Sequence, residues 1–77
     1  MKINIIVFGQ LYDMTKVAQF TINEVDNTEQ LTQKIMERFP LLSEFKFSMA
    51  VNKKIVHGNT ILNNEDIVAL LPAFSGG

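Results

Sequence analysis

The sequence predicts an α+β domain in which one mixed sheet of about five strands packs on one main helix. Three observations lead to this prediction. Short stretches rich in β-branched and aromatic residues follow one another in the order β-β-α-β-β-β. One stretch between them carries a single apolar stripe with helical spacing. The first and last strand-like stretches become apolar on both faces, which is typical of central strands.

The first two strands are predicted at residues 2–10 and 17–22. Both stretches are rich in Ile, Val and Phe and alternate between two faces, so they are expected to pair as a hairpin. Residues 9–16 form the connection, and residues 11–14 allow a helical turn within it.

The main helix is predicted to begin at Asn27, whose side chain is a good N-cap, with Gln30 placed to close a capping box. Thr28 is the competing N-cap. Pro40 ends the helix, because the residue before a proline disfavours the helical region. One apolar stripe faces the core. Its residues are Leu31, Ile35, Met36 and Phe39.

The second half of the chain predicts three more strands, and Pro72 is expected to stop the last of them. Between the helix and these strands, Leu42 and Phe45 are expected to tuck under the end of the helix. The predicted strands are residues 47–51, 55–56 and 67–71. With the first and last strands side by side in the middle, this order gives the β-grasp arrangement, one sheet wrapped on one helix. The predicted domain covers residues 1–72, and residues 73–77 form a flexible tail.

Length, charge and residue content exclude several classes of function. The chain has 77 residues, enough for one small domain with a thin core. Its net charge of −1 argues against nucleic-acid binding, which needs a basic face. No apolar run approaches a membrane span, and no signal peptide precedes the first strand, so a cytoplasmic protein is expected. The absence of cysteine excludes disulfides and thiol nucleophiles.

A few titratable residues stand out without forming a catalytic constellation. His57 is the only histidine, and we interpret it as a solvated turn residue; no metal site is expected. The adjacent acids Glu65 and Asp66 are interpreted as a solvated turn. The pair Lys53 and Lys54 is interpreted in the same way, although basic residues on a binding surface could steer an acidic partner.

The chain ends on Phe74, Ser75, Gly76 and Gly77. Glycine lacks a Cβ, so a Gly-Gly stalk can enter a slot too narrow for any side chain. Such a stalk can carry a terminal carboxylate to a reagent held deep inside another protein.

Three stretches together resemble the small subunit of molybdopterin synthase, a bacterial sulfur carrier of the ubiquitin-like β-grasp family. They are residues 49–54, MAVNKK, residues 67–77, IVALLPAFSGG, and residues 7–11, VFGQL. The resemblance covers the whole chain in length and element order. Ala73 departs from it, because the family often has a second proline there.

The resemblance implies a function as a sulfur-donating subunit without catalytic side chains of its own. Gly77 would be adenylated by an ATP-dependent partner and converted to a thiocarboxylate. The thiocarboxylate would donate sulfur to cyclic pyranopterin monophosphate, forming the molybdopterin dithiolene. The carrier would bind no cofactor, since ATP serves the activating partner. It would assemble with the large subunit as a heterotetramer of two small and two large subunits.

An apolar patch at the root of the tail is the expected docking site for the large subunit. Phe8, Ile55 and Leu71 fall on strands that converge there, and a domain of this size has no second core for them. By resemblance, the family uses these positions and Phe74 against its large subunit.

Other functions remain open at this point. The chain could be a sulfur carrier of thiamine biosynthesis, or a ubiquitin-like modifier attached through Gly77 to lysines. It could also be a β-grasp interaction module with an incidental Gly-Gly ending.

Overall fold

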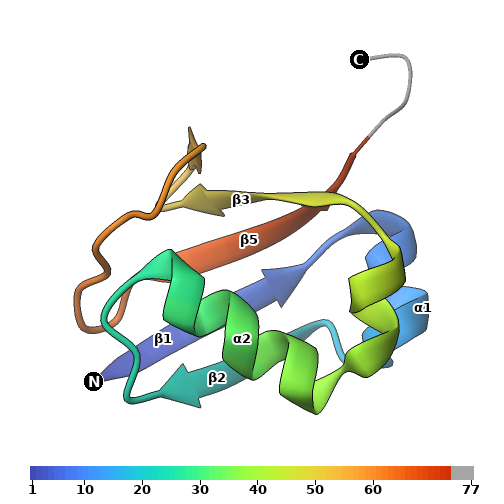
Figure 1. Cartoon of the computed structure of the whole chain (residues 1–77), viewed down its shortest axis with the longest axis horizontal. Helices are drawn as coiled ribbons and strands as arrows, with labels where there is room; N and C mark the ends of the chain where they lie inside the picture. The colour runs from blue at the N-terminus through green and yellow to red at the C-terminus, as the bar shows by residue number, and fades with distance from the viewer. Residues whose placement is uncertain (74–77) are drawn as a thin grey trace.

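The computed structural model describes residues 1–73 and shows one five-stranded sheet with a helix across one face (Figure 1). The strand order is β2-β1-β5-β3-β4. The strands are β1 (Lys2–Val7), β2 (Gln19–Asn23), β3 (Phe47–Val51), β4 (Lys54–Val56) and β5 (Ile67–Pro72). The helices are α1 (Tyr12–Thr15) and α2 (Thr28–Arg38), with 3-10 turns η1 (Gly9–Leu11) and η2 (Pro40–Glu44).

The two ends of the described chain meet in the middle of the sheet. β1 pairs in parallel with β5, and all other strand pairs are antiparallel. This confirms the predicted β-grasp arrangement with the first and last strands at the centre. β1 and β5 take the central positions because both strands carry apolar residues on each face, which suits a strand that lies between two other strands.

The core lies between α2 and one face of the sheet. Alternate residues of the central strands point into it, as the period of two requires. On α2, Leu31 and Ile35 are fully buried, whereas Met36 and the C-cap residue Phe39 are partly buried beside them. Burying one such aliphatic side chain contributes about 1.5–3 kcal/mol, so these few contacts hold the helix on the sheet. The buried strand residues include Ile3, Ile5, Val7, Val68 and Leu70.

The N-terminus of α2 has protein acceptors for each of its first three N–H groups. Asn27 is the N-cap, and its Oδ1 accepts from the Gln30 N–H at 2.9 Å. The Thr28 N–H donates to the Thr60 carbonyl, and the Glu29 N–H donates to Asn59 Oδ1. The predicted capping box is altered, because the Gln30 side chain accepts from the backbone N–H of Asp26 instead of Asn27.

One further expectation is wrong. Leu42 is fully buried as expected, whereas Phe45 is 39% exposed. The last strand ends at Pro72 as expected, although Pro72 is itself its final residue and is buried opposite Phe47. A proline is tolerated there because Phe47 and Pro72 form a non-hydrogen-bonded pair, beside the bonded pair of Ala73 and Lys46, so β3 needs no N–H from it.

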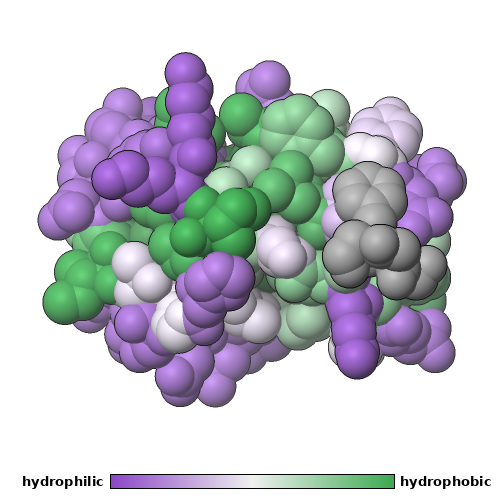
Figure 2. Space-filling model, turned by 90° about the horizontal axis from the view of Figure 1, so that it is seen from above, coloured by the Kyte–Doolittle hydropathy of each residue, from purple (hydrophilic) through white to green (hydrophobic). Residues whose placement is uncertain are grey.

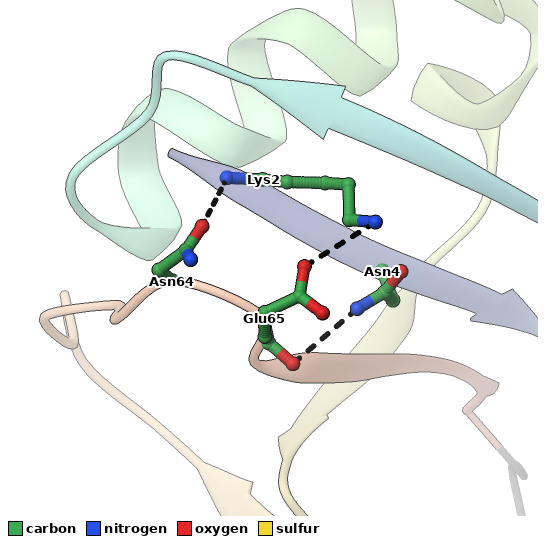
Figure 3. Close-up of polar contacts among 4 residues, drawn as sticks. All are labelled: Lys2, Asn4, Asn64 and Glu65. Atoms are coloured by element: carbon green, nitrogen blue, oxygen red, sulfur yellow. Dashed lines mark hydrogen bonds and ion pairs between the residues drawn. The ribbon is translucent and has the colours of Figure 1, made fainter.

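Two residues before β5, Asn64 and Glu65, fasten its start to β1 (Figure 3). The Lys2 N–H donates to Asn64 Oδ1 at 2.8 Å, and Asn4 Nδ2 donates to the Glu65 carbonyl at 3.3 Å. Lys2 Nζ also lies 3.3 Å from Glu65 Oε1, but this exposed ion pair adds little stability. The hydrogen bonds set where the parallel pairing of β1 and β5 begins.

The turn between β3 and β4 is bound to the same segment through Asn52 and Asp66. Asn52 Nδ2 donates to Asp66 Oδ1 at 2.8 Å, and Asn52 Oδ1 accepts from the Ile67 N–H at 2.9 Å. Asp66 Oδ2 accepts in addition from the Asn63 N–H. Asp66 is therefore a structural acceptor, and its interpretation as a solvated turn residue is wrong.

We predict that Asn52→Ala lowers the free energy of unfolding by about 2 kcal/mol, and the melting temperature by roughly 8–16 °C. The substitution removes both side-chain hydrogen bonds and places alanine at a φ of 49°, which asparagine tolerates better. Thermal unfolding followed by circular dichroism measures the change. Asn63→Ala is the matched control, because the Asn63 side chain makes no hydrogen bond to residues 1–73. Equal stability of the two variants would contradict the structural role of Asn52.

Candidate functional site

The root of the tail is held by contacts from two segments of the chain, at Lys46 and at Gly9. The Ala73 N–H donates to the Lys46 carbonyl at 3.3 Å, beside the buried ring of Pro72. Gly9 has a φ of +60°, and a Cβ there would lie 2.8 Å from Pro72 Cγ. A residue with a side chain at this position would therefore push Pro72 away or strain its own backbone. The chain consequently leaves the sheet from a defined point.

A groove of about 560 Å³ opens at this point, which we call the tail-root groove. Phe8 and Ile55 are 45% and 48% exposed, values high for large apolar side chains. Figure 2, seen from above relative to Figure 1, shows apolar surface across the middle of this side of the molecule, with polar surface at both ends. The groove is lined by Phe8, Gly9, Ser48, Ile55, Leu71, Pro72 and Ala73.

Strand register explains why these side chains share one face. Ser48 lies opposite Leu71, and Ala50 lies opposite both Ala69 and Ile55. Paired residues point to the same side of a sheet, so these side chains project from the face that α2 does not cover (Figure 1). The alternate residues of the same strands point into the core under α2. The side chains on the opposite face of the sheet therefore face solvent or a partner.

The structure brings three of the predicted site residues together. Phe8, Ile55 and Leu71 all line the tail-root groove. Their role against a partner stays a prediction, and the predicted tail residues lie outside the described part of the chain. Those residues are Phe74, Ser75, Gly76 and Gly77.

Sequence reasoning missed the contributions of Gly9 and Ser48 to the groove. Ser48 enters through its register opposite Leu71, which no pattern within one strand reveals. Gly9 gave a weak signal, a glycine directly after a strand, which is typical of a backbone that must approach another segment closely.

The titratable residues His57, Glu65 and Asp66 do not line the tail-root groove. Residues 1–73 contain no group of three or more His, Asp or Glu side chains placed to hold a metal ion. His57 is exposed and lines a separate hollow of about 630 Å³ beside α2, together with Glu29 and Lys46. In the same part of the chain, no helix has the length and apolar character needed to cross a membrane.

We predict that truncation after Ala73 changes the melting temperature by no more than about 4 °C, while abolishing any activity of the tail. The truncated chain keeps the Ala73–Lys46 hydrogen bond and the buried Pro72. Calorimetry measures the change. Truncation after Leu71 is the comparison, since it removes Pro72 from the core and is expected to be clearly destabilising. A large loss of stability in the first variant would place Phe74 in the core.

Several solved structures share this fold. The chain superposes on a protein described as molybdopterin converting factor, subunit 1, of Pyrococcus furiosus with a TM-score of 0.87 and 19% identity, covering 95% of this chain and 98% of that one. SAMP1 of Haloferax volcanii gives a TM-score of 0.84 at 16% identity, with both chains fully covered. These two likenesses show the fold.

A third structure is a complex of subunits 1 and 2 of the molybdopterin-converting factor of Helicobacter pylori 26695. The matched chain gives a TM-score of 0.74 at 26% identity, and both chains are covered completely. Strand order, the single main helix and these likenesses define a ubiquitin-like β-grasp protein. The chain belongs to the ThiS family of ubiquitin-like sulfur carriers, because the family's sequence profile matches residues 5–77.

Proposed function

We propose that this sulfur carrier is the small subunit of a molybdopterin synthase, which donates sulfur from Gly77 to cyclic pyranopterin monophosphate. The observation that carries the proposal is the full-length match, at 26% identity, to a chain from the complex of molybdopterin-converting factor subunits 1 and 2. The exposed apolar tail-root groove supports it, because an open apolar hollow on a small domain is typical of an interface.

The proposed activation makes a poor electrophile reactive. A carboxylate oxygen of Gly77 attacks the α-phosphate of ATP and releases pyrophosphate, giving an acyl adenylate. A sulfur nucleophile at the oxidation level of sulfide then attacks the carbonyl carbon, and AMP leaves. The product is a thiocarboxylate, whose sulfur is a better nucleophile than oxygen. Two such carriers supply the two sulfurs of the dithiolene, and hydrolysis returns each Gly77 to a carboxylate.

The proposal divides the work between the carrier and its partners. The carrier binds no cofactor and presents its tail, while the ATP-dependent adenylating enzyme binds ATP. The large subunit holds the pterin and supplies acids and bases.

The large subunit is proposed to cover the tail-root groove, in an assembly of two small and two large subunits. The groove adjoins Ala73, so a protein seated on it receives the tail directly. Residues 74–77 span at most about 14 Å when extended, so Gly77 can react only in a pocket within that distance of the groove.

Reconstitution tests the proposed function. The carrier is incubated with ATP, the adenylating enzyme and a sulfur source, then added to the large subunit and cyclic pyranopterin monophosphate. We expect molybdopterin to form, measured by fluorescence of its oxidised derivative. Co-purification from the native cell separates the alternatives. A thiamine-pathway enzyme in place of the large subunit would indicate the thiamine carrier, and ladders of larger conjugates would indicate a protein modifier.

A further inference from the structure

The two edges of the sheet differ in whether another strand can join them. At β2, the carbonyls of Thr21 and Asn23 face outward, and two cations from α2 occupy them. Arg38 Nη1 donates to the Thr21 carbonyl at 3.4 Å, and Lys34 Nζ donates to the Asn23 carbonyl at 3.0 Å. Arg38 also lies 4.9 Å from the Phe20 ring centroid, which holds it in place. Side chains of α2 therefore close this edge.

At β4, the backbone of Ile55 faces outward. The Asn52 N–H donates to the Ile67 carbonyl at 2.8 Å, so the backbone of Asn52 faces β5. Backbone groups of successive residues point to opposite sides of a strand, so the N–H and carbonyl of the preceding residue, Val51, point toward β4. The backbone of Val51 therefore forms hydrogen bonds with that of Lys54 across the two-residue turn. The following pair, Ala50 and Ile55, is then a non-hydrogen-bonded pair, so the N–H and carbonyl of Ile55 point away from β3. Outside the ladder, no hydrogen bond joins the Ile55 backbone to residues 1–73.

The open edge is continuous with the tail-root groove. The Ile55 side chain lines the groove, and its backbone donor and acceptor lie at the adjoining rim. Lys53 and Lys54 directly precede Ile55, and both are exposed and form no ion pair with the described residues. A protein that covers the groove and extends past Ile55 therefore meets the free N–H and the free carbonyl of Ile55. It also meets the positive charges of Lys53 and Lys54.

We propose that the partner seated on the tail-root groove adds an extended, acidic strand to β4. This inference rests on the proposed function and names how that partner binds. The Ile55 N–H and carbonyl bond the added strand, and an Asp or Glu side chain of that strand lies beside Lys53 or Lys54. β4 offers only one outward-facing residue between its ends, and short edge strands resist unspecific pairing. Strand addition is thus too weak to recruit a second copy and strengthens binding only for a partner already on the groove.

Amide hydrogen exchange followed by NMR tests the strand addition. In the free carrier we expect the Ile55 amide to exchange as fast as that of Thr21, which faces outward at the other edge. In the complex with the large subunit, the Ile55 amide is expected to slow by about tenfold or more, while Thr21 is unchanged. A complex that leaves the Ile55 amide fast would overturn the strand addition alone. Failure to form any complex would overturn the proposed function as well.

Backbone methylation gives a second readout that leaves every side chain in place. A synthetic carrier with N-methyl Ile55 should keep its melting temperature and bind the large subunit about tenfold more weakly, as expected for one lost hydrogen bond. A carrier with N-methyl Thr21 is the matched control and should bind normally. Equal binding by both, or a stable homodimer that N-methyl Ile55 disrupts, would overturn the proposal.

Discussion

Deleting Gly77 is expected to reduce loading of the carrier with sulfur by about 100-fold or more, with no change in melting temperature. The reacting carboxylate must meet the α-phosphate of ATP within the adenylating enzyme, while the domain is seated through its folded surface. Ala73 is fixed to Lys46 and Pro72 is buried, so the reach of the tail is counted from a defined origin. Removing one residue shortens that reach by about 3.3–3.6 Å, far more than a reacting group tolerates.

Intact mass spectrometry after incubation with ATP, the adenylating enzyme and a sulfur source measures loading. The wild type should exchange one oxygen for one sulfur on Gly77. A residue added after Gly77 should be as harmful as the deletion. Gly76→Phe should impair loading strongly, because its side chain widens the stalk, and Gly77→Ala should impair it less. Sulfur on the deletion variant, or elsewhere on a chain that has no cysteine, would rule out the carrier mechanism.

Phe8→Glu is expected to weaken binding of the large subunit by roughly 30-fold or more while the domain remains folded. Phe8 is 45% exposed and lines the tail-root groove, so a charge there is solvated in the free carrier. In the complex the same charge would be buried without a partner, which is costly. Isothermal titration calorimetry measures the affinity, and circular dichroism checks the fold.

Ile61→Glu is the matched control for Phe8→Glu. Ile61 is 75% exposed and lies outside the groove, so the same charge should leave binding unchanged. Leu71→Glu is a weaker test, because Leu71 is partly buried and its replacement by a charged residue is expected to cost stability. An unfolded Phe8→Glu variant would show that Phe8 belongs to the core, and normal binding would remove it from the interface.

The sequence predicted the fold through features that act locally. The stripe on α2 was readable because Leu31 and Ile35 recur at helical spacing, and both are buried. Asn27 was readable as the N-cap because its side chain satisfies a donor three residues away. The central position of β1 and β5 could be predicted because both strands carry apolar residues on both faces. This pattern is typical of strands that have a neighbouring strand on each side and are covered by other residues.

The errors concern contacts that no pattern within a single element shows. Asp66 was interpreted as solvated, but its Oδ1 accepts from Asn52, 14 residues away, and its Oδ2 accepts from the Asn63 N–H. Pro72 ends the last strand as expected, but it is the final paired residue, opposite Phe47 of β3, and not the first residue after the strand. Phe45 was expected to be buried with Leu42, but only Leu42 is buried.

Only part of the candidate site could be predicted from the sequence. Phe8, Ile55 and Leu71 could be selected because they are surplus to a small core, and the structure places all three on one groove. The closing of one sheet edge by Lys34 and Arg38, and the open backbone of Ile55, depend on register and helix position. Neither follows from periodicity within a single element.

The parallel pairing of β1 and β5 also has a mechanical consequence. Asn4 to Val7 lie beside Ile67 to Leu70, with the two strands running in the same direction. A pull on the tail against the start of β1 therefore loads this whole row of hydrogen bonds in shear, and none can open before the others. A hairpin pulled from its open end would instead unzip one bond at a time. We expect single-molecule stretching to show one abrupt rupture at high force, whereas gradual lengthening would contradict this geometry. The domain can therefore withstand tension on the segment that it presents.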